Sequence, residues 1–205
     1  MIGIINYGLG NISAFKNIYR RLNIESNCIS SPVEIEKCTK LILPGVGSFD
    51  HALDSLNKSE LLPSIENAVI NSKKPILGVC VGMQILANKS MEGEQKGLGW
   101  IPGEVLSFSE FNKDGNLRIP QIGWNNLINI NRENPLFKDI SINPKFYFLH
   151  SFFYKCQDYE NSISETTYGE VFTSSICKDN IFGVQFHPEK SHINGIKVLK
   201  NFALL

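Results

Sequence analysis

Residues 75–86, PILGVCVGMQIL, decide the fold that this sequence predicts. The apolar run at 76–79 is typical of a buried strand, and the apolar residues after position 82 follow the spacing of a helix. Between the two, Gly78 and Gly82 flank Cys80 in the G-x-C-x-G spacing of a nucleophile elbow, with sulfur in place of the serine oxygen. Glycines at these places allow a strand and a helix to approach closely around a strained turn. The stretch therefore predicts a strand–turn–helix unit built around a cysteine.

The thiol of Cys80 is a candidate nucleophile because of where this turn places it. The start of a helix offers free backbone N–H groups and the positive end of the helix dipole, and both favour the reactive thiolate. A small buried structural cysteine is the alternative, since free cysteines are among the most buried residues. The pentapeptide alone leaves both interpretations open.

A second motif, His187-Pro188-Glu189, follows an apolar strand at 182–186. Residues i and i+2 of an extended segment project to the same side, so Glu189 can accept from one ring nitrogen of His187 and leave the other free. That is the base and the orienting acid of a catalytic triad. Pro188 has no N–H and ends the strand at the rim of the sheet. Taken alone, the motif also fits a surface histidine beside a solvated glutamate.

A third motif, Pro44-Gly45-Val46-Gly47, comes directly after the predicted core strand at 41–43. Two glycines in four residues can turn backbone N–H groups toward one point, as an oxyanion hole requires, and a plain turn is the alternative. The cysteine elbow, the later His-x-Glu and this loop each need the others to work. Their presence in one chain favours a hydrolytic site over three unrelated features.

The elements around these motifs alternate between strands and helices in the first half of the chain and are mainly strands in the second. Strands are predicted at 2–5, 41–43, 76–79, 103–108, 145–150, 171–176 and 181–186. Helices are predicted from a cap at Asn11 or Ser13 to Leu22, over 61–72, after the elbow and over 193–204. The pattern predicts an α/β fold with a mixed, largely parallel central sheet, helices on both faces and ligands at the carboxyl ends of its parallel strands.

Composition and charge exclude several classes of protein. The 205 residues suit a single domain spanning 1–205, and 20 basic against 20 acidic residues point neither to nucleic acid nor to an anionic membrane as partner. No apolar stretch approaches the ~18 residues that span a bilayer, and the first residues lack the features of a secretory signal. The five cysteines are scattered without a CxxC pair, so we expect no metal site, no disulfide framework and reduced thiols in the cytoplasm.

Together, the motifs resemble the class I (triad) glutamine amidotransferases. The elbow and the stretch FHPE at 186–189 are a specific pair for that family. Within it, the chain is similar over nearly its whole length to the glutaminase subunits of imidazole glycerol phosphate synthase. The stretches that carry this similarity are 6–11 (NYGLGN), 44–49 (PGVGSF), 82–84 (GMQ), 97–100 (GLGW), 123–125 (GWN) and 188–191 (PEKS).

The resemblance implies the flavodoxin-like three-layer fold of that family and a role for each matched residue. It makes Cys80 the nucleophile, His187 the general base and acid, and Glu189 the residue that orients the histidine. The residues it implies in the oxyanion hole or in holding glutamine are Gly45, Val46, Gly47, Val81, Gln84, His150, Ser151 and Phe152. Those it implies at a partner interface are Asn11, Trp124 and Lys190. No metal or organic cofactor is expected.

The same resemblance implies a heterodimer with a (β/α)8-barrel synthase subunit. L-Glutamine is expected to be hydrolysed here, and the ammonia to pass through a channel to the barrel, which makes imidazole glycerol phosphate and AICAR in histidine biosynthesis. The stretches at 15–19 and 191–195, however, look more like a sister branch that supplies ammonia for acetamidino groups of bacterial surface sugars. The pathway therefore stays open between histidine and surface-glycan synthesis.

Two further alternatives have less support from the residues. A cysteine peptidase of similar architecture is expected to carry His directly after the nucleophile, where this chain has Val81. An idle scaffold that only binds a partner barrel is expected to have lost a residue of the triad, and all three are present.

Overall fold

A mixed sheet of ten strands forms the centre of the part of the chain that the computed structural model describes, residues 1–112 and 115–205. Its strands are β1 (Ile2–Ile5), β2 (Ser26–Ile29), β3 (Lys40–Gly45), β4 (Ile76–Cys80), β5 (Lys89–Ser90), β6 (Gly103–Ser107), β9 (Phe152–Cys156), β10 (Ser162–Tyr168), β11 (Glu170–Lys178) and β12 (Ile181–Val184). They lie in the order β2-β1-β3-β4-β12-β11-β9-β6-β5, with β10 paired to β11.

Parallel pairing holds the centre of this sheet together. From β2 to β12 every neighbouring pair is parallel, and from β12 to β6 every neighbouring pair is antiparallel. Every residue of β1, β4 and β12 is buried, as expected for parallel strands that are covered on both faces. The mixed, largely parallel sheet that the sequence predicts is confirmed.

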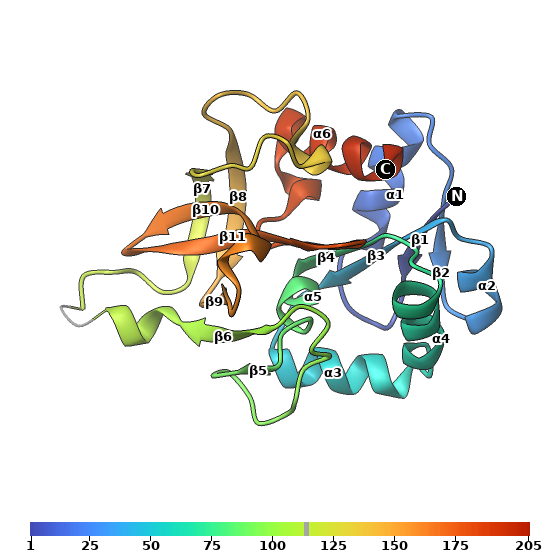
Figure 1. Cartoon of the computed structure of the whole chain (residues 1–205), viewed down its shortest axis with the longest axis horizontal. Helices are drawn as coiled ribbons and strands as arrows, with labels where there is room; N and C mark the ends of the chain where they lie inside the picture. Colours follow the sequence, from blue (N-terminus) through green and yellow to red (C-terminus); the bar gives the residue numbers. More distant parts are fainter. Residues whose placement is uncertain (113–114) are drawn as a thin grey trace.

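Helices cover this sheet on its two faces and make the fold three-layered. The α-helices are α1 (Ile12–Arg21), α2 (Pro32–Glu36), α3 (Phe49–Lys58), α4 (Leu62–Glu66), α5 (Val81–Gln84) and α6 (His192–Leu204). A π-helical turn spans Asn67–Asn71, and 3-10 turns span Phe108–Phe111, Pro135–Phe137, Tyr159–Asn161 and Pro188–Lys190. Figure 1 shows α1 and α6 on one side of the strands and α3 and α4 on the other. In the described part of the chain, no helix combines the length and the apolar character that crossing a membrane requires.

Several elements differ from the predicted ones. The helix predicted after the elbow ends at Gln84 after a single turn, and the helix predicted over 61–72 is divided into α4 and the π-helical turn. Helix α3 was not predicted, although its buried residues Phe49, Ala52, Leu53 and Leu56 have helical spacing. Strands β2, β5, β9 and β10 were also missed, because short or half-exposed strands have no long apolar run.

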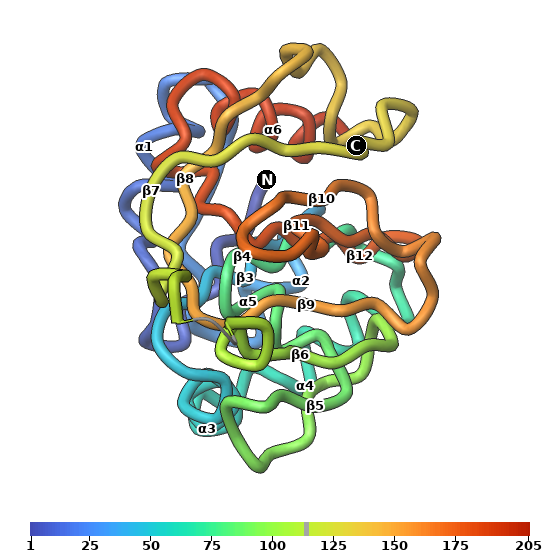
Figure 2. The backbone as a smooth tube through the Cα atoms, turned by 90° about the vertical axis from the view of Figure 1, so that its left-hand side faces the viewer, coloured from blue at the N-terminus to red at the C-terminus, as the bar shows by residue number. Residues whose placement is uncertain are grey.

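A separate two-stranded ribbon is formed by β7 (Gln121–Asn126) and β8 (Lys145–His150), which pair in antiparallel register from Gln121 opposite His150 to Asn126 opposite Lys145. Only β8 was predicted from the sequence. Phe146 and Phe148 anchor the ribbon on the residues after β12, with ring centroids 4.0 and 5.9 Å from that of Phe186. Figures 1 and 2 show the ribbon crosswise to the main sheet, beside the end of β4 that carries the elbow.

Candidate active site

Cys80 occupies the strained turn that the sequence predicts. It is the last residue of β4, immediately precedes α5, and has φ 55° and ψ −114°. An L-residue with positive φ is under backbone strain, and such strain gathers at functional sites. The side chain is buried, with 4% of its surface exposed, and lies at the wall of a pocket.

The two glycines of the elbow are required by the close packing around this turn. A Cβ on Gly78 would lie 2.5 Å from the carbonyl oxygen of Gly82, and a Cβ on Gly82 would lie 2.0 Å from the carbonyl oxygen of Leu43. Real Cβ atoms do not approach backbone this closely. The turn, the strand before it and the neighbouring end of β3 therefore fit together only with glycine at both positions.

Gly82→Ala is expected to lower the free energy of unfolding by about 3 kcal/mol, because the new methyl group meets the backbone of Leu43 and neither can move away. For a chain of this size, that corresponds to a decrease in Tm of roughly 6–12 °C, measured by circular dichroism. Gly8→Ala is the control: φ is +92° there and the space around its Cβ is open, so its cost is limited to roughly 1–2 kcal/mol of backbone strain. A Tm for Gly82→Ala equal to that of the unmodified protein would contradict the proposed close fit.

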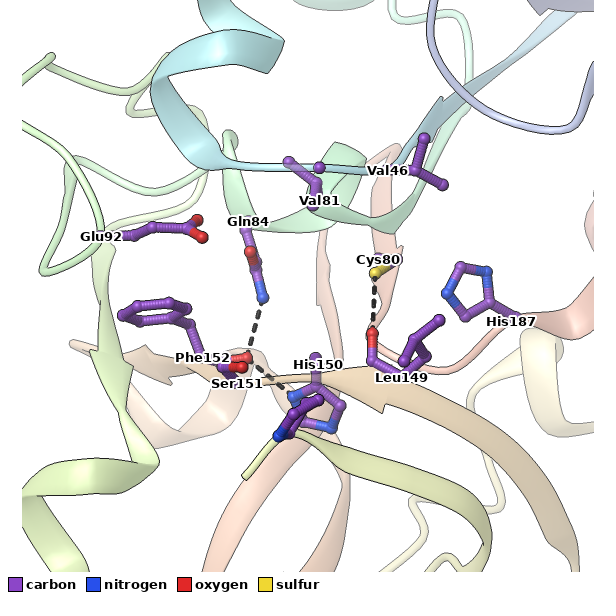
Figure 3. A pocket seen from close by; sticks show the side chains of 12 residues that line it. Val46, Cys80, Val81, Gln84, Glu92, Leu149, His150, Ser151, Phe152 and His187 are labelled. Atoms are coloured by element: carbon purple, nitrogen blue, oxygen red, sulfur yellow. Dashed lines mark hydrogen bonds between the residues drawn. The ribbon is translucent and has the colours of Figure 1, made fainter. Parts of the chain in front are cut away.

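His187 and Glu189 form the predicted pair. Nδ1 of His187 lies 2.8 Å from Oε1 of Glu189, and both side chains are about 4% exposed. The backbone of His187 is held on both sides: its N–H donates to Tyr147 at 2.8 Å and its carbonyl accepts from the hydroxyl of Ser191 at 2.6 Å. With Nδ1 taken by Glu189, the other ring nitrogen is available to the pocket side, where Figure 3 shows the imidazole beside Cys80.

The charges of the site favour a protonated His187. Burial by itself lowers the pKa of this imidazole, but hydrogen bonds to Cys80 and Glu189 and the negative charges of both raise it, to about 10. Because α5 has only one turn, the long helix dipole that we expected behind the thiolate is absent. Stabilisation of a thiolate at Cys80 therefore falls mainly to the imidazolium and to nearby N–H donors.

The pocket at the elbow has a volume of about 260 Å³. It is lined by Val46, Gly47, Cys80, Val81, Gln84, Glu92, Pro120, Leu149, His150, Ser151, Phe152 and His187. Most of the candidate residues from the sequence thus meet around one cavity, although they come from four separate stretches of the chain (Figure 3). Glu189 stands behind the imidazole of His187 rather than in the lining.

The glycine-rich loop lies against the elbow at the end of β3. Gly45 is packed on the start of α5, where a Cβ would lie 2.3 Å from the N of Gly82, so it supports the loop instead of lining the pocket. The hydroxyl of Tyr7 donates to the carbonyl of Pro44 at 2.7 Å and holds the base of the loop. Val46 and Gly47 reach the pocket, the latter with φ +93°, beside Val81. The backbone of this loop and the start of α5 thus border the pocket together beside Cys80.

His150, at the end of β8, is a buried and neutral part of the pocket wall. Burial lowers its pKa to about 4, against the hydrogen bond to the Phe152 carbonyl. Its Nδ1 lies 2.7 Å from that carbonyl oxygen, which can only accept, and its Nε2 lies 2.9 Å from the side-chain amide of Gln121. The ring thus orients the backbone of the 150–152 turn.

Three lining residues were missed from the sequence: Glu92, Pro120 and Leu149. Glu92 matters most, because it is the pocket carboxylate at the end opposite His187 (Figure 3). Its Oε2 accepts from the N–H of Phe49 at 2.8 Å. Half-burial and the neighbouring charge of Asp50 raise its pKa. No local pattern marks this residue, which lies in the coil after β5.

The residues expected at a partner interface are partly brought together. Trp124 is 46% exposed and stacks on the ring of His192, with centroids 4.9 Å apart and planes at 6°. Nζ of Lys190 lies 5.6 Å from the ring centroid of Tyr147, whose ring meets Trp124 edge-on. Asn11 is exposed and caps α1 by accepting from the N–H of Ala14.

The cysteines and the possible metal ligands of the described residues form neither a disulfide nor a metal site. The five cysteines are free thiols. Among residues 1–112 and 115–205, no group of three or more His, Cys, Asp and Glu side chains is arranged to hold a metal ion.

Curated relatives match this chain along their full length. The chain is 48% identical over 205 residues to the imidazole glycerol phosphate synthase subunit HisH of Leptospira borgpetersenii, covering all of both chains. It is 46% identical over 203 residues to the subunit of the same name in Bdellovibrio bacteriovorus, covering 99% of each.

Solved structures with lower sequence identity share the fold. A crystal structure of a glutamine amidotransferase superposes with a TM-score of 0.74 at 17% identity, covering 100% of this chain and 99% of the other. The structure of PurLQS from Thermotoga maritima superposes with a TM-score of 0.72 at 21% identity, covering 98% and 96%. The family model "Glutamine amidotransferase class-I" matches residues 4–205. With this match, and with full-length relatives nearly half identical to it, the chain belongs to the class I glutamine amidotransferases, enzymes that act on glutamine.

Proposed function

We propose that this chain hydrolyses L-glutamine to glutamate and ammonia with a triad of Cys80, His187 and Glu189. One observation carries the proposal: the thiol on the strained elbow and the imidazole that is bonded to Glu189 line the same pocket. The family to which the chain belongs supplies the substrate class.

The reaction proceeds through a thioester. The thiolate of Cys80 attacks the side-chain amide carbon of glutamine, and the oxyanion that forms is held by backbone N–H groups of Val81 and of the glycine-rich loop, each worth ~3 kcal/mol. His187 protonates the leaving nitrogen, so ammonia departs and a γ-glutamyl thioester remains. His187 then takes a proton from water, whose oxygen attacks the thioester, and glutamate leaves as the thiolate reforms.

Glu92 receives the α-ammonium group of glutamine in this proposal. Its carboxylate lines the pocket at the end opposite His187, so a glutamine whose amide lies at Cys80 extends its charged end toward it (Figure 3). One carboxylate oxygen is already fixed by the N–H of Phe49, which orients the group before substrate arrives. The charge pair selects an amino acid over an uncharged amide.

Glu92→Gln is expected to raise KM for glutamine roughly 10- to 100-fold with a much smaller change in kcat, since a hydrogen bond between charged groups is worth about 1.5–3 kcal/mol. Gln keeps an acceptor for the N–H of Phe49, so the fold is spared. Glutamate release at varied glutamine concentration measures the effect. Glu94→Gln, a change at an exposed glutamate two residues away, is the control and leaves KM unchanged. An unaltered KM in Glu92→Gln would exclude this binding role.

A partner subunit docks, in this proposal, on the outer face of the ribbon at the pocket mouth. Ile122, Trp124 and Leu149 expose 62%, 46% and 38% of their surface there, a large apolar area beside an active site. The names of the relatives describe one subunit of imidazole glycerol phosphate synthase. We infer that the partner is the (β/α)8-barrel synthase subunit, to which ammonia passes and which makes imidazole glycerol phosphate and AICAR.

The experiment that tests this function measures glutamate release with each candidate barrel subunit of the same genome, with and without the histidine-pathway ligand. Release that the histidine-pathway barrel and its ligand stimulate supports the proposal. Stimulation only by a barrel from a surface-sugar gene cluster keeps the glutaminase chemistry and moves the pathway to the sister branch. Absence of release with every barrel contradicts the glutaminase proposal.

A further inference from the structure

A chain of buried amide groups approaches the sulfur of Cys80 independently of His187. The side chain of Gln185, which is fully buried just after β12, has its Nε2 3.7 Å from Cys80 Sγ. Its Oε1 accepts from Nε2 of Gln84 at 2.9 Å, and the same Nε2 donates to the carbonyl of Phe152, also at 2.9 Å. The three contacts join Cys80 at the end of β4, Gln84 of α5, the residue that follows β12 and the first residue of β9.

The orientation of the two side-chain amides follows from the carbonyl of Phe152, at which this series of hydrogen bonds ends. The carbonyl oxygen of Phe152 can only accept, so the amide of Gln84 must present its NH2 group to it. The second N–H of that group is then directed to the oxygen of Gln185, and this fixes the Gln185 amide with its own NH2 toward the sulfur. The backbone of the 150–152 turn thus determines that Gln185 presents a donor to Cys80, whereas the carbonyl oxygen of Leu149 lies 3.9 Å from the same sulfur.

We propose that Gln185 is a further catalytic residue, whose side-chain N–H stabilises the thiolate of Cys80, and that Gln84 is the positioning residue that orients it. This inference rests on the proposed function, in which Cys80 is the nucleophile. A thiolate that is 4% exposed has little water to solvate it and depends on donors from the protein. Helix α5 has a single turn and therefore only a small dipole, so a side-chain donor contributes more to stabilising the thiolate.

The inference also changes the role of Gln84. Both N–H groups of its amide are used inside the protein, one by Phe152 and one by Gln185, so it cannot donate to glutamine. Its oxygen is the part of the amide that can still meet a substrate in the pocket, and its N–H groups act on the reaction through Gln185.

The test is the pH dependence of alkylation of Cys80 by iodoacetamide without glutamine, followed by mass spectrometry of the peptide that contains Cys80. Gln185→Met keeps the length of the side chain and removes the N–H. We expect the midpoint of its alkylation profile to move upward by about one pH unit, and the rate at pH 7 to fall roughly tenfold, while the rate at high pH is retained. Gln84→Met is expected to shift the profile in the same direction by less.

A second variant and a control keep the result decisive. Gln185→Leu also removes the N–H and adds no charge beside the sulfur, so it should shift the profile even if Gln185→Met does not fold. Ser164→Ala removes a buried hydroxyl that bonds Ser174 and Ser175, away from the pocket, and should leave the profile unchanged.

Two outcomes separate this inference from the proposed function. A midpoint below that of an ordinary thiol in the unmodified protein, with no shift in the folded Gln185 variants, overturns the role of Gln185 alone. An ordinary thiol profile for Cys80 in the unmodified protein contradicts its assignment as an activated nucleophile, and with it both proposals.

Discussion

Cys80→Ala is expected to abolish glutamate release, with kcat reduced on the order of 10⁴-fold or more, because no other group in the pocket can form the thioester. Loss of one buried sulfur leaves the elbow and its glycines in place, so the variant should fold and still bind glutamine. Glutamate release in the presence of the activating barrel subunit measures the first effect. Calorimetric titration with glutamine measures the second.

Cys28→Ala is the matched control for this experiment, since Cys28 is a half-buried thiol on β2, away from the pocket. It is expected to retain full activity. Trapping of a radiolabelled glutamyl adduct in the unmodified protein, and its loss in Cys80→Ala alone, would identify the thioester directly. Glutamate release that survives Cys80→Ala would refute the mechanism.

Glu189→Gln is expected to reduce kcat on the order of 10³- to 10⁴-fold with little change in KM. The carboxylate contributes to the raised pKa of His187, so its replacement by a neutral amide lowers that pKa. A smaller fraction of His187 is then protonated at neutral pH, and the thiolate of Cys80 is less stabilised. The NH2 group of Gln can also donate to Nδ1 of His187, which favours the tautomer that carries its proton on Nε2. The measurement is the pH profile of kcat, together with alkylation of Cys80, which should slow at neutral pH.

The buried surroundings of Glu189 make this effect large. In the described part of the chain its second oxygen has no hydrogen-bond partner, so the carboxylate interacts chiefly with His187. Glu34→Gln is the control, because that glutamate only accepts from Ser30 and Ser31 at the start of α2 and should be silent in the assay. A kcat for Glu189→Gln close to that of the unmodified protein would remove Glu189 from the triad.

Much of the fold and part of the site could be predicted, because their sequence signals lie within a few neighbouring residues. The apolar runs of β1, β3 and β4 and the glycines around Cys80 each mark their structure within a few residues. The pairing of His187 with Glu189 was predicted from their i, i+2 spacing in an extended segment, and Nδ1 and Oε1 do lie 2.8 Å apart, although residues 188–190 form a 3-10 turn instead.

Other elements were missed where a local signal was weak or misleading. The residues after Cys80 have helical spacing, but the chain leaves the helix at Gln84. Strand β7 contains Gly123 and two asparagines, residues that are rare in strands, so its sequence does not indicate a strand. It is a strand because it pairs with β8. His192 has no partner near it in sequence, yet its ring stacks on Trp124.

The sequence by itself thus determined the parallel sheet, the elbow and the three residues that we propose as a triad, because backbone sterics and apolar periodicity act over a few neighbouring positions. Only the tertiary structure decided what surrounds the nucleophile: the carboxylate of Glu92, the wall at His150 and the amide of Gln185. Gln84 and Gln185 are 101 positions apart, and the direction of each amide depends on a carbonyl at Phe152. The direction of these amides depends on which donors and acceptors are buried together when the protein folds, and no local sequence pattern contains that information.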